Sequence, residues 1–252
     1  MFKKDIFGQY FFLKKFVVRV VALVVYRRLT KINTPVIKGT EKLNDLSACN
    51  VLFVSNHQTY FADGIFMFNV FNSALNNSYA QIKFWNILKV KIVNLFFIAA
   101  QETMSAGIVP KFLSLAGAIP VKRTWREAGK EIKRGVEKKD TENIEKALKT
   151  GWVITFPQGT TTAYAVGRKG TAHIIKNYKP VVVPVVIDGL RQAFGKKGNQ
   201  IIKRGVDLKL TVKEPLKLDY NDTVENILET VMDAIEQSEK FRQSVKPEKL
   251  KS

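Results

Sequence analysis

The sequence is poor in acidic residues, histidine and cysteine. Its 252 residues hold 22 Asp and Glu against 41 Lys and Arg, so the formal net charge is +19. Such an excess indicates a polyanionic partner, and nucleic acid and an anionic membrane surface are the two candidates. The one cysteine, Cys49, can form neither an internal disulfide nor a cysteine-based zinc site, which is typical of a protein from a reducing compartment.

The chain also lacks internal repeats, Pro- or Gly/Ser-rich linkers and a long apolar run. Hydrophobic residues make up 46% of it, enough for one sizeable core, so we expect a single domain. The apolar stretch at residues 16–26 contains Arg19 and, at about 1.5 Å per residue, covers roughly half of a bilayer's hydrocarbon thickness. We therefore expect neither a secretory signal nor a membrane span there.

The first 32 residues carry a local net charge of about +7 around that stretch. Lys15 and Arg19 lie one helical turn apart, beside a wide apolar arc that predicts a helix lying in the membrane interface. The arc consists of Phe12, Phe16, Val17, Val20, Ala22, Leu23 and Val24. An amphipathic helix packed on the protein's own core is the alternative. We expect residues 1–34 to associate with membrane, residues 35–240 to form the main domain, and residues 241–252 to be a basic tail.

After Pro35, apolar stretches and helical patterns alternate, which is typical of an α/β domain with a largely parallel or mixed sheet flanked by helices. We expect strands at residues 49–55, 94–100, 118–121, 152–156, 181–187 and 208–212. We expect helices at residues 61–75, 80–92, 109–115, 130–150, 171–177 and 222–235. Pro184 predicts a sheet edge or a bulge, because proline cannot donate to a strand ladder. The chain from residue 240 onward is predicted to be frayed.

A polar segment with His57 and Asp63 follows the first predicted strand. Such segments are where α/β folds place their sites. A carboxylate can hold one imidazole nitrogen protonated while the other accepts a proton from a hydroxyl, which is general-base chemistry. Six helical residues would set the two side chains about 120° apart, so His57 must lie in the loop and Asp63 in the helix. The alternative is a structural histidine, with Asn56 and Asp63 capping a helix.

A second polar segment, residues 156–162, follows another predicted strand and is rich in threonine. Its hydroxyls and the turn amides that Gly159 permits can bind a phosphate or a carbonyl oxygen, and Arg168 and Lys169 can add positive charge. A Thr-rich polar turn is the alternative. Between the two segments runs a predicted strand that ends in Lys122 and Arg123.

In this order and spacing, the segments resemble the phospholipid/glycerol acyltransferase family, whose best-known members are the 1-acylglycerol-3-phosphate acyltransferases. The family's blocks are Asn-His-x4-Asp, Gly-x-x-Phe-Ile-x-Arg, Phe-Pro-Glu-Gly-Thr-Arg-Ser and a Val-Pro-rich strand. The matching positions are Asn56, His57 and Asp63, then residues 117–123, 156–162 and 181–187. The resemblance covers roughly residues 36–215, and four blocks in order are far more specific than one alone.

The chain departs from the family pattern in three places. Five residues rather than four separate His57 from Asp63, so one residue must bulge from the loop or the helix start if the two are to meet. The second block has Ile-Pro where the family has Phe-Ile. The third block has Gln158 and Thr161 in place of Glu and Arg, which removes the bidentate donor best suited to a phosphate.

The resemblance implies transfer of a fatty acyl group from acyl-CoA or acyl carrier protein to a lysolipid hydroxyl, without an acyl-enzyme, a metal or a bound cofactor. It implies that His57 removes the hydroxyl proton, that Asp63 steadies the imidazolium, and that Gly159 and its neighbours donate to the oxyanion. The substrate-binding residues that it implies are Asn56, Gly117, Lys122, Arg123, Phe156, Pro157, Gln158, Gly159, Thr160, Thr161, Arg168 and Lys169.

The expected acceptor on family frequency is 1-acylglycerol-3-phosphate (lysophosphatidic acid), in phospholipid biosynthesis. The substitutions in the third block leave a lyso-aminoacyl lipid, such as an ornithine or glycine lipid, as the alternative acceptor. We expect a peripheral or monotopic protein at the cytoplasmic face of an anionic membrane, where each Lys or Arg near the surface contributes on the order of 1 kcal/mol.

Two other classes remain as alternatives. A nonenzymatic nucleic-acid-binding protein would explain the charge, but the sequence lacks zinc-finger spacing, an RNP-like aromatic strand and a basic region leading into heptads, so we expect no nucleic acid partner. The second is a membrane-binding family member without catalysis. His173, the other histidine, is predicted to be structural.

Overall fold

The computed structural model describes residues 4–91, 94–105, 107–122, 126–127, 130–131, 135 and 137–244. One sheet contains β1 (Thr34–Lys38), β2 (Val51–Ser55), β3 (Leu95–Ala100), β4 (Ala118–Val121), β7 (Trp152–Thr155), β8 (Val181–Asp188) and β9 (Asp207–Val212), and a separate pair consists of β5 (Arg126–Glu127) and β6 (Lys130–Glu131). The helices are α1 (Phe11–Thr30), η1 (Thr40–Asp45), α2 (Ala62–Leu75), α3 (Phe84–Leu88), α4 (Gln101–Ser105), α5 (Ile108–Ser114), α6 (Lys138–Thr150), α7 (Lys169–Tyr178), α8 (Leu190–Ala193), α9 (Val224–Ala234) and α10 (Glu239–Ser244).

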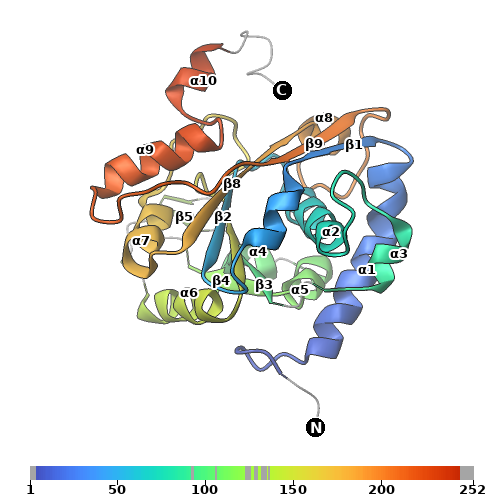
Figure 1. The fold of residues 1–252 in the computed structure, drawn as a ribbon, viewed down its shortest axis with the longest axis horizontal. Coiled ribbons are helices and arrows are strands. Elements are labelled where there is room, and N and C mark those ends of the chain that lie inside the picture. Colours follow the sequence, from blue (N-terminus) through green and yellow to red (C-terminus); the bar gives the residue numbers. More distant parts are fainter. Residues whose placement is uncertain are drawn as a thin grey trace.

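The strands of the large sheet follow the order β1-β9-β8-β2-β7-β3-β4, and helices cover both of its faces (Figure 1). Neighbouring strands run parallel, except that β8 and β9 are antiparallel. The predicted fold class, an α/β domain with a largely parallel sheet, is therefore confirmed.

The central strand β2 shows how the two faces form. Alternate side chains of a strand point to opposite faces. Phe53 joins a hydrophobic cluster with residues of α1, α2 and η1, whereas Leu52 and Val54 join a cluster with residues of α6, α7 and α9. Every residue of β2 is buried as a result, which explains why its sequence is continuously apolar.

The sheet edge that Pro184 predicted is not found, because β8 lies inside the sheet between β2 and β9. The ladder to β9 begins only at Val185, so the missing N–H of Pro184 interrupts no pair on that side. The Pro184 carbonyl, which faces the same side as its nitrogen, accepts from the backbone N–H of Lys213 at 2.9 Å. A proline is tolerated here because the contact on this side uses only its carbonyl.

Helix lengths differ from the prediction in three places. α3 and α6 are shorter than the stretches predicted at 80–92 and 130–150, and α10 occupies part of the tail that we expected to be frayed. In α6 the Glu-Lys pairs spaced one turn apart begin only at Lys138, where the helix begins. β1, η1, α4 and α8 had no periodic pattern of sufficient length and were not predicted.

α1 is apolar on two opposite sides. Val17, Ala22 and Leu29 are buried against the domain, while Phe12 and Phe16 are exposed with Leu23 and Val24. The helix therefore packs on the core, as the alternative had it, and also presents an apolar surface outward. Within the residues that the structure describes, no helix has both the length and the hydropathy to cross a membrane.

Lys14 is the exception on the buried side of α1. Its ammonium lies 4.0 Å from the centre of the Phe96 ring and has no hydrogen-bond partner among the described residues. Burial lowers the pKa of Lys14 to about 8, and the Asp5 carboxylate opposes part of that shift. Lys14 thus belongs to the packing of the helix and contributes less positive charge than its exposed neighbours.

Candidate active site

The predicted pair of His57 and Asp63 forms in the structure. His57 lies in the loop after β2, Asp63 lies in the first turn of α2, and His57 Nδ1 is 2.7 Å from Asp63 Oδ2. The Asp63 side chain is fully buried, whereas the imidazole is 15% exposed. Because Nδ1 is engaged by the carboxylate, Nε2 is the nitrogen left to accept a proton from a ligand.

The extra residue between His57 and Asp63 is accommodated in the loop, which folds back over the carboxylate. Asp63 Oδ2 accepts from the backbone N–H of Gln58 at 2.5 Å and of Thr59 at 3.1 Å, and the Thr59 hydroxyl donates to Oδ1 at 3.0 Å. With His57, four groups thus converge on one buried carboxylate. These bonds fix the position and orientation of the carboxylate beside the imidazole.

The loop before β9 packs against this arrangement. Gly198 has φ of +80°, and a Cβ there would lie 2.6 Å from the backbone nitrogen of Ala62. The Tyr60 N–H donates to the Lys196 carbonyl at 3.0 Å. The loop before β9 can approach so closely only because glycine stands at position 198.

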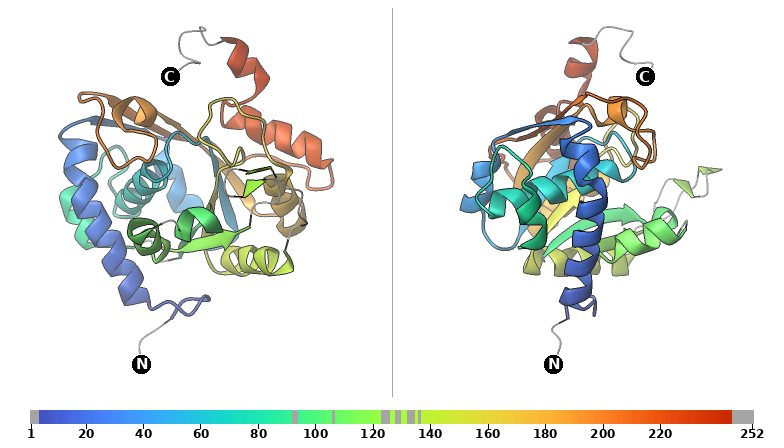
Figure 2. Two further views of the ribbon diagram at one scale, coloured as in Figure 1. Left: turned by 180° about the vertical axis from the view of Figure 1, so that it is seen from behind. Right: turned by 90° about the vertical axis from the view of Figure 1, so that its right-hand side faces the viewer.

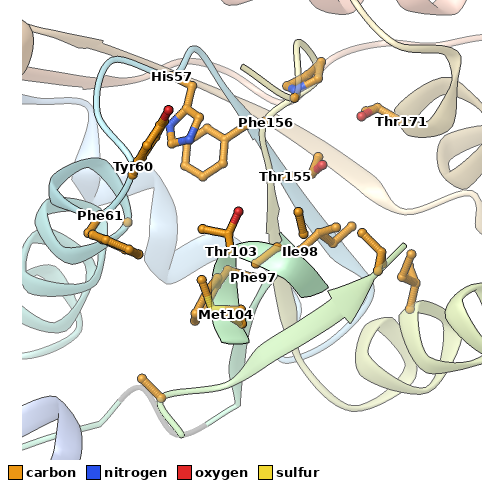
Figure 3. A pocket seen from close by; sticks show the side chains of 18 of the residues that line it. His57, Tyr60, Phe61, Phe97, Ile98, Thr103, Met104, Thr155, Phe156 and Thr171 are labelled. Atoms are coloured by element: carbon orange, nitrogen blue, oxygen red, sulfur yellow. The ribbon is translucent and has the colours of Figure 1, made fainter. Parts of the chain in front are cut away.

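The imidazole ring is also held from the side. Phe156, directly after β7, stacks on His57 with ring centres 4.1 Å apart and planes 19° from parallel (Figure 3). β7 pairs with β2 in the sheet, so the carboxyl ends of two adjacent parallel strands bring the two rings together.

His57 and Phe156 line a cavity of about 1070 Å³ at this end of the sheet. One wall is apolar and comes from α1 to α5 with β3; among its residues are Val21, Phe61, Ile65, Phe68, Ile87 and Met104. The opposite wall is more polar and comes from β4, α6 and α7; among its residues are Lys122, Asp140, Arg168, His173 and Tyr178. The catalytic candidates thus lie where an apolar and a polar compartment meet, which suits an amphipathic ligand.

The family model described as Acyltransferase matches residues 35–188. The chain belongs to this family. No curated protein matches the sequence. Among solved structures, the chain is similar to the 1-acyl-sn-glycerophosphate (LPA) acyltransferase PlsC from Thermotoga maritima, with 19% identity, a TM-score of 0.54, and coverage of 95% of this chain and 82% of that one. At this identity the likeness shows the fold.

Most of the residues predicted for the acyltransferase site line its cavity. Those that do are His57, Lys122, Phe156, Pro157, Gly159, Thr160, Thr161, Arg168 and Lys169. Asp63 lies behind His57. Asn56, Gly117 and Gln158 are not among the lining residues, and Arg123 lies outside the described residues.

Asn56 and Gly117 have structural contacts instead. Asn56 bridges the loop to β8, because its Nδ2 donates to the Ile187 carbonyl at 2.7 Å and its Oδ1 accepts from the Ile187 N–H at 2.8 Å. At Gly117, with φ of +116°, a Cβ would lie 2.6 Å from the carbonyl oxygen of Leu95. Both residues shape the acyltransferase site without facing its cavity.

Gln158, which replaces the family's Glu, is directed into the protein. Its Nε2 donates to the Ala165 carbonyl at 3.0 Å and to Gln237 Oε1 at 3.2 Å, and Gln237 Oε1 also accepts from the Tyr164 N–H at 2.9 Å. The side chain thus ties the loop after β7 to the C-terminal part of the acyltransferase.

The expectation that Gly159 serves the oxyanion directly does not hold, because its N–H donates to the Phe156 carbonyl at 2.9 Å. Its positive φ of +62° makes the turn possible, and the neighbouring Thr160 and Thr161 line the cavity beside it. Glycine at this position is required by the turn conformation.

The cations of the polar wall are partly neutralised. Lys122 Nζ lies 2.7 Å from Glu137 Oε1, and Lys169 pairs with Glu225, whose pKa the hydrogen bond from Lys169 lowers. Sequence reasoning missed Arg191 on α8, whose guanidinium donates to the Thr161 carbonyl. Its place just after the Val-Pro-rich strand β8 was the available signal. His173, predicted to be structural, is exposed and lines the cavity.

Proposed function

We propose that this acyltransferase moves a fatty acyl group from an acyl thioester, acyl-CoA or acyl carrier protein, to the hydroxyl of a lysolipid, most favourably 1-acylglycerol-3-phosphate. The observation that carries the proposal is the pairing of His57 with the buried Asp63 on the wall of a cavity that is apolar on one side. Family membership limits the chemistry to acyl transfer, and the PlsC-like fold supports a lipid acceptor.

In this mechanism, Asp63 fixes His57 with its Nδ1 protonated. Nε2 accepts the proton of the lysolipid hydroxyl as the oxygen attacks the thioester carbonyl. The imidazolium is stabilised by Asp63 and returns the proton to the departing thiolate, so the products are the ester and the free thiol. Thr160 and Thr161, the neighbours of Gly159 that line the cavity, would donate to the oxyanion.

The two walls of the cavity suit the two ends of such substrates. The apolar wall, with Ile65, Phe68 and Ile87, fits a fatty acyl chain, whose burial contributes about 0.8 kcal/mol per methylene. The polar wall, with Lys122 and Arg168, fits an acidic head group or the phosphates of the donor.

Membrane association is part of the proposal, because acceptor and product are lipids. α1 carries exposed Phe12 and Phe16 and lies in a segment with an excess of basic side chains. An apolar surface flanked by cations is what an anionic bilayer interface binds.

A lyso-aminoacyl lipid is the second candidate acceptor. Gln158 turns away from the cavity, Thr161 brings no charge, and the nine-tenths buried Asp140 contributes a carboxylate to the polar wall. A head group with an amino function would pair with Asp140, whereas a phosphomonoester would be repelled by it.

The experiment is an acyl-transfer assay of the purified protein against a panel of lysolipids, with acyl-CoA and acyl carrier protein thioesters as separate donors. We expect turnover with lysophosphatidic acid that His57→Ala abolishes. Turnover with aminoacyl lysolipids and not with lysophosphatidic acid would make the lyso-aminoacyl lipid the acceptor. Absence of transfer to every acceptor, with folded protein and both donors, would overturn the function.

A further inference from the structure

α3 presents a large apolar surface that the proposed chemistry does not use. Trp85 is 70% exposed, and Phe84 and Leu88 on the same short helix are exposed as well. The opposite side of α3 faces inward, since Ile87 is 2% exposed and lines the cavity. A helix of five residues thus separates the apolar wall of the cavity from solvent.

The exposed side of α3 continues the exposed side of α1. The Phe84 and Tyr26 rings lie 5.5 Å apart, and Arg19 donates from Nε and Nη2 to the Leu88 carbonyl at 3.2 and 3.0 Å. Arg19 and Tyr26 are thus α1 residues that contact α3. At about 100° per residue they lie about 40° and 60° from the centre of the exposed stripe of α1, so α3 borders that stripe. We call the combined surface the docking face; it consists of Phe12, Phe16, Leu23, Phe84, Trp85 and Leu88.

Both helices of the docking face also line the cavity. Val18 and Val21 contribute from α1, and Ile87 contributes from α3 with Val90 just after it. α1 and α3 lie side by side along one flank of the domain (Figures 1 and 2). The seam between them therefore lies between the docking face and the apolar wall of the cavity.

The positive charge around the docking face favours an anionic bilayer as its binding partner. Residues 11–32 and 80–91, which contain both helices, include Lys15, Arg19 and Lys83 among other basic residues and no acidic one. A second copy of the chain carries the same net charge of +19 and would be repelled. Tryptophan next to basic residues is typical of protein surfaces at the bilayer interface.

We propose that α1 and α3 together dock on an anionic bilayer, and that acyl chains pass from the bilayer into the cavity through the seam between them. The passage rests on the proposed function, whereas the docking does not. Trp85 is then the interfacial anchor of α3, and Arg19, bonded to the Leu88 carbonyl, closes the seam at its polar edge.

Trp85 fluorescence tests the docking directly. Vesicles of equal parts phosphatidylglycerol and phosphatidylcholine, with bromine on the acyl chains, should quench a component of the emission that is absent in Trp85→Phe. Vesicles of phosphatidylcholine alone should quench it much less. Sedimentation of the protein with vesicles without quenching of this component would overturn the proposal, since another face would then bind.

Trp85→Ser should weaken binding to the anionic vesicles about tenfold, since one large apolar side chain contributes on that order. The matched control is Val181→Ser, because Val181 is exposed and stands at the amino end of β8, away from the docking face and from the residues that line the cavity. Equal losses in both variants would overturn the proposal. So would self-association that Trp85→Ser abolishes in the absence of lipid, because the face would then bind a second copy.

Passage through the seam predicts a change in the ratio of two turnover numbers. Turnover with a long-chain acceptor in vesicles, divided by turnover with a short-chain acceptor in solution, should fall about tenfold in Trp85→Ser and stay constant in Val181→Ser. An unchanged ratio despite weaker docking would overturn the passage. Quenching by vesicles without acyl transfer to any acceptor would leave the docking intact and refute the proposed function.

Discussion

The loop after β2 and the loop after β7 meet at the cavity, but different contacts hold them. In the first loop, residues 56–63, four groups bind the single carboxylate of Asp63. In the second, residues 156–168, the contacts reach outward, through Gln158 to Gln237 and through the Thr161 carbonyl to Arg191. The carboxylate of the proposed catalytic pair is thus held by its own loop, although Asn56 and Tyr60 also bind Ile187 and Lys196. The loop proposed to face the acceptor is held through Gln237 and Arg191.

This difference explains which sequence changes each loop tolerates. An extra residue between His57 and Asp63 leaves the pair intact, because the bonds to Asp63 come from Gln58 and Thr59 next to it. The second loop has exchanged the family's Glu and Arg for neutral residues without losing its turn. The proposed chemistry and the proposed acceptor recognition are thus assigned to different loops, and substitutions in each loop test them separately.

The largest effect is expected for His57→Ala. A positioned general base contributes about 10²- to 10⁴-fold, so turnover should fall by that factor. Release of free thiol from the thioester donor measures it. Because the imidazole is partly exposed and Phe156 remains in place, thermal unfolding should change little. Turnover close to that of the unmodified protein would show that the first loop does not carry the chemistry.

Asp63→Asn should lower turnover about 10²-fold and also destabilise the fold. An amide would direct N–H groups toward the donors of Gln58 and Thr59, and an unsatisfied buried group costs about 1–3 kcal/mol. Turnover and the midpoint of denaturant unfolding should therefore both fall. A variant that loses stability but keeps its turnover would make the carboxylate a structural group only.

Thr59→Val isolates one bond of the first loop. It removes the hydroxyl that donates to Asp63 Oδ1 and keeps the side-chain shape, so turnover should fall about tenfold, as expected for loss of about 1.4 kcal/mol. Thr59→Ser, which keeps the hydroxyl, is the matched control and should stay within about threefold of the unmodified protein. Equal losses in both variants would point to packing rather than hydrogen bonding.

Much of this site was predictable because its residues stand at the carboxyl ends of short apolar strands. β2 and β7 were recognisable as buried strands, and His57 and Phe156 stand within two residues of their ends. The pairing of His57 with Asp63 across five residues was not predictable from helical geometry, since it depends on the loop that Thr59 closes. Spacing alone locates such a pair but does not show whether it forms.

The features of the site and the fold that the sequence did not predict depend on long-range contacts. Arg191 is one of 41 basic residues, and its contact with the second loop depends on the sheet order, which sets only β2 between β7 and β8. Pro184 was assigned to an edge or a bulge because the sequence does not show where the neighbouring ladder ends. These features depend on tertiary neighbours, which residue propensity and hydrophobic periodicity do not reveal.

Thr161→Arg tests the second loop from the side of the acceptor. Thr161 lines the cavity, and an Arg there would restore a bidentate donor for phosphate. The KM for lysophosphatidic acid should fall about tenfold, which corresponds to about 1.4 kcal/mol, while the KM for an aminoacyl lysolipid should not fall. Thr161→Gln, which is polar but uncharged, is the control. Equal changes for both acceptors would mean that this loop does not select the head group.

Gln158→Glu should have the smallest effect on turnover and a measurable one on stability. A carboxylate at this position would face the Ala165 carbonyl and Gln237 Oε1, two acceptors that now receive hydrogen bonds from Gln158 Nε2. Loss of these bonds in a buried site should cost about 1–2 kcal/mol and lower the Tm by several degrees at pH 8. Protonation of the glutamate restores a donor, so the deficit should shrink toward pH 4.5. A Tm deficit that is independent of pH would mean that the second loop is held by its shape and not by these hydrogen bonds.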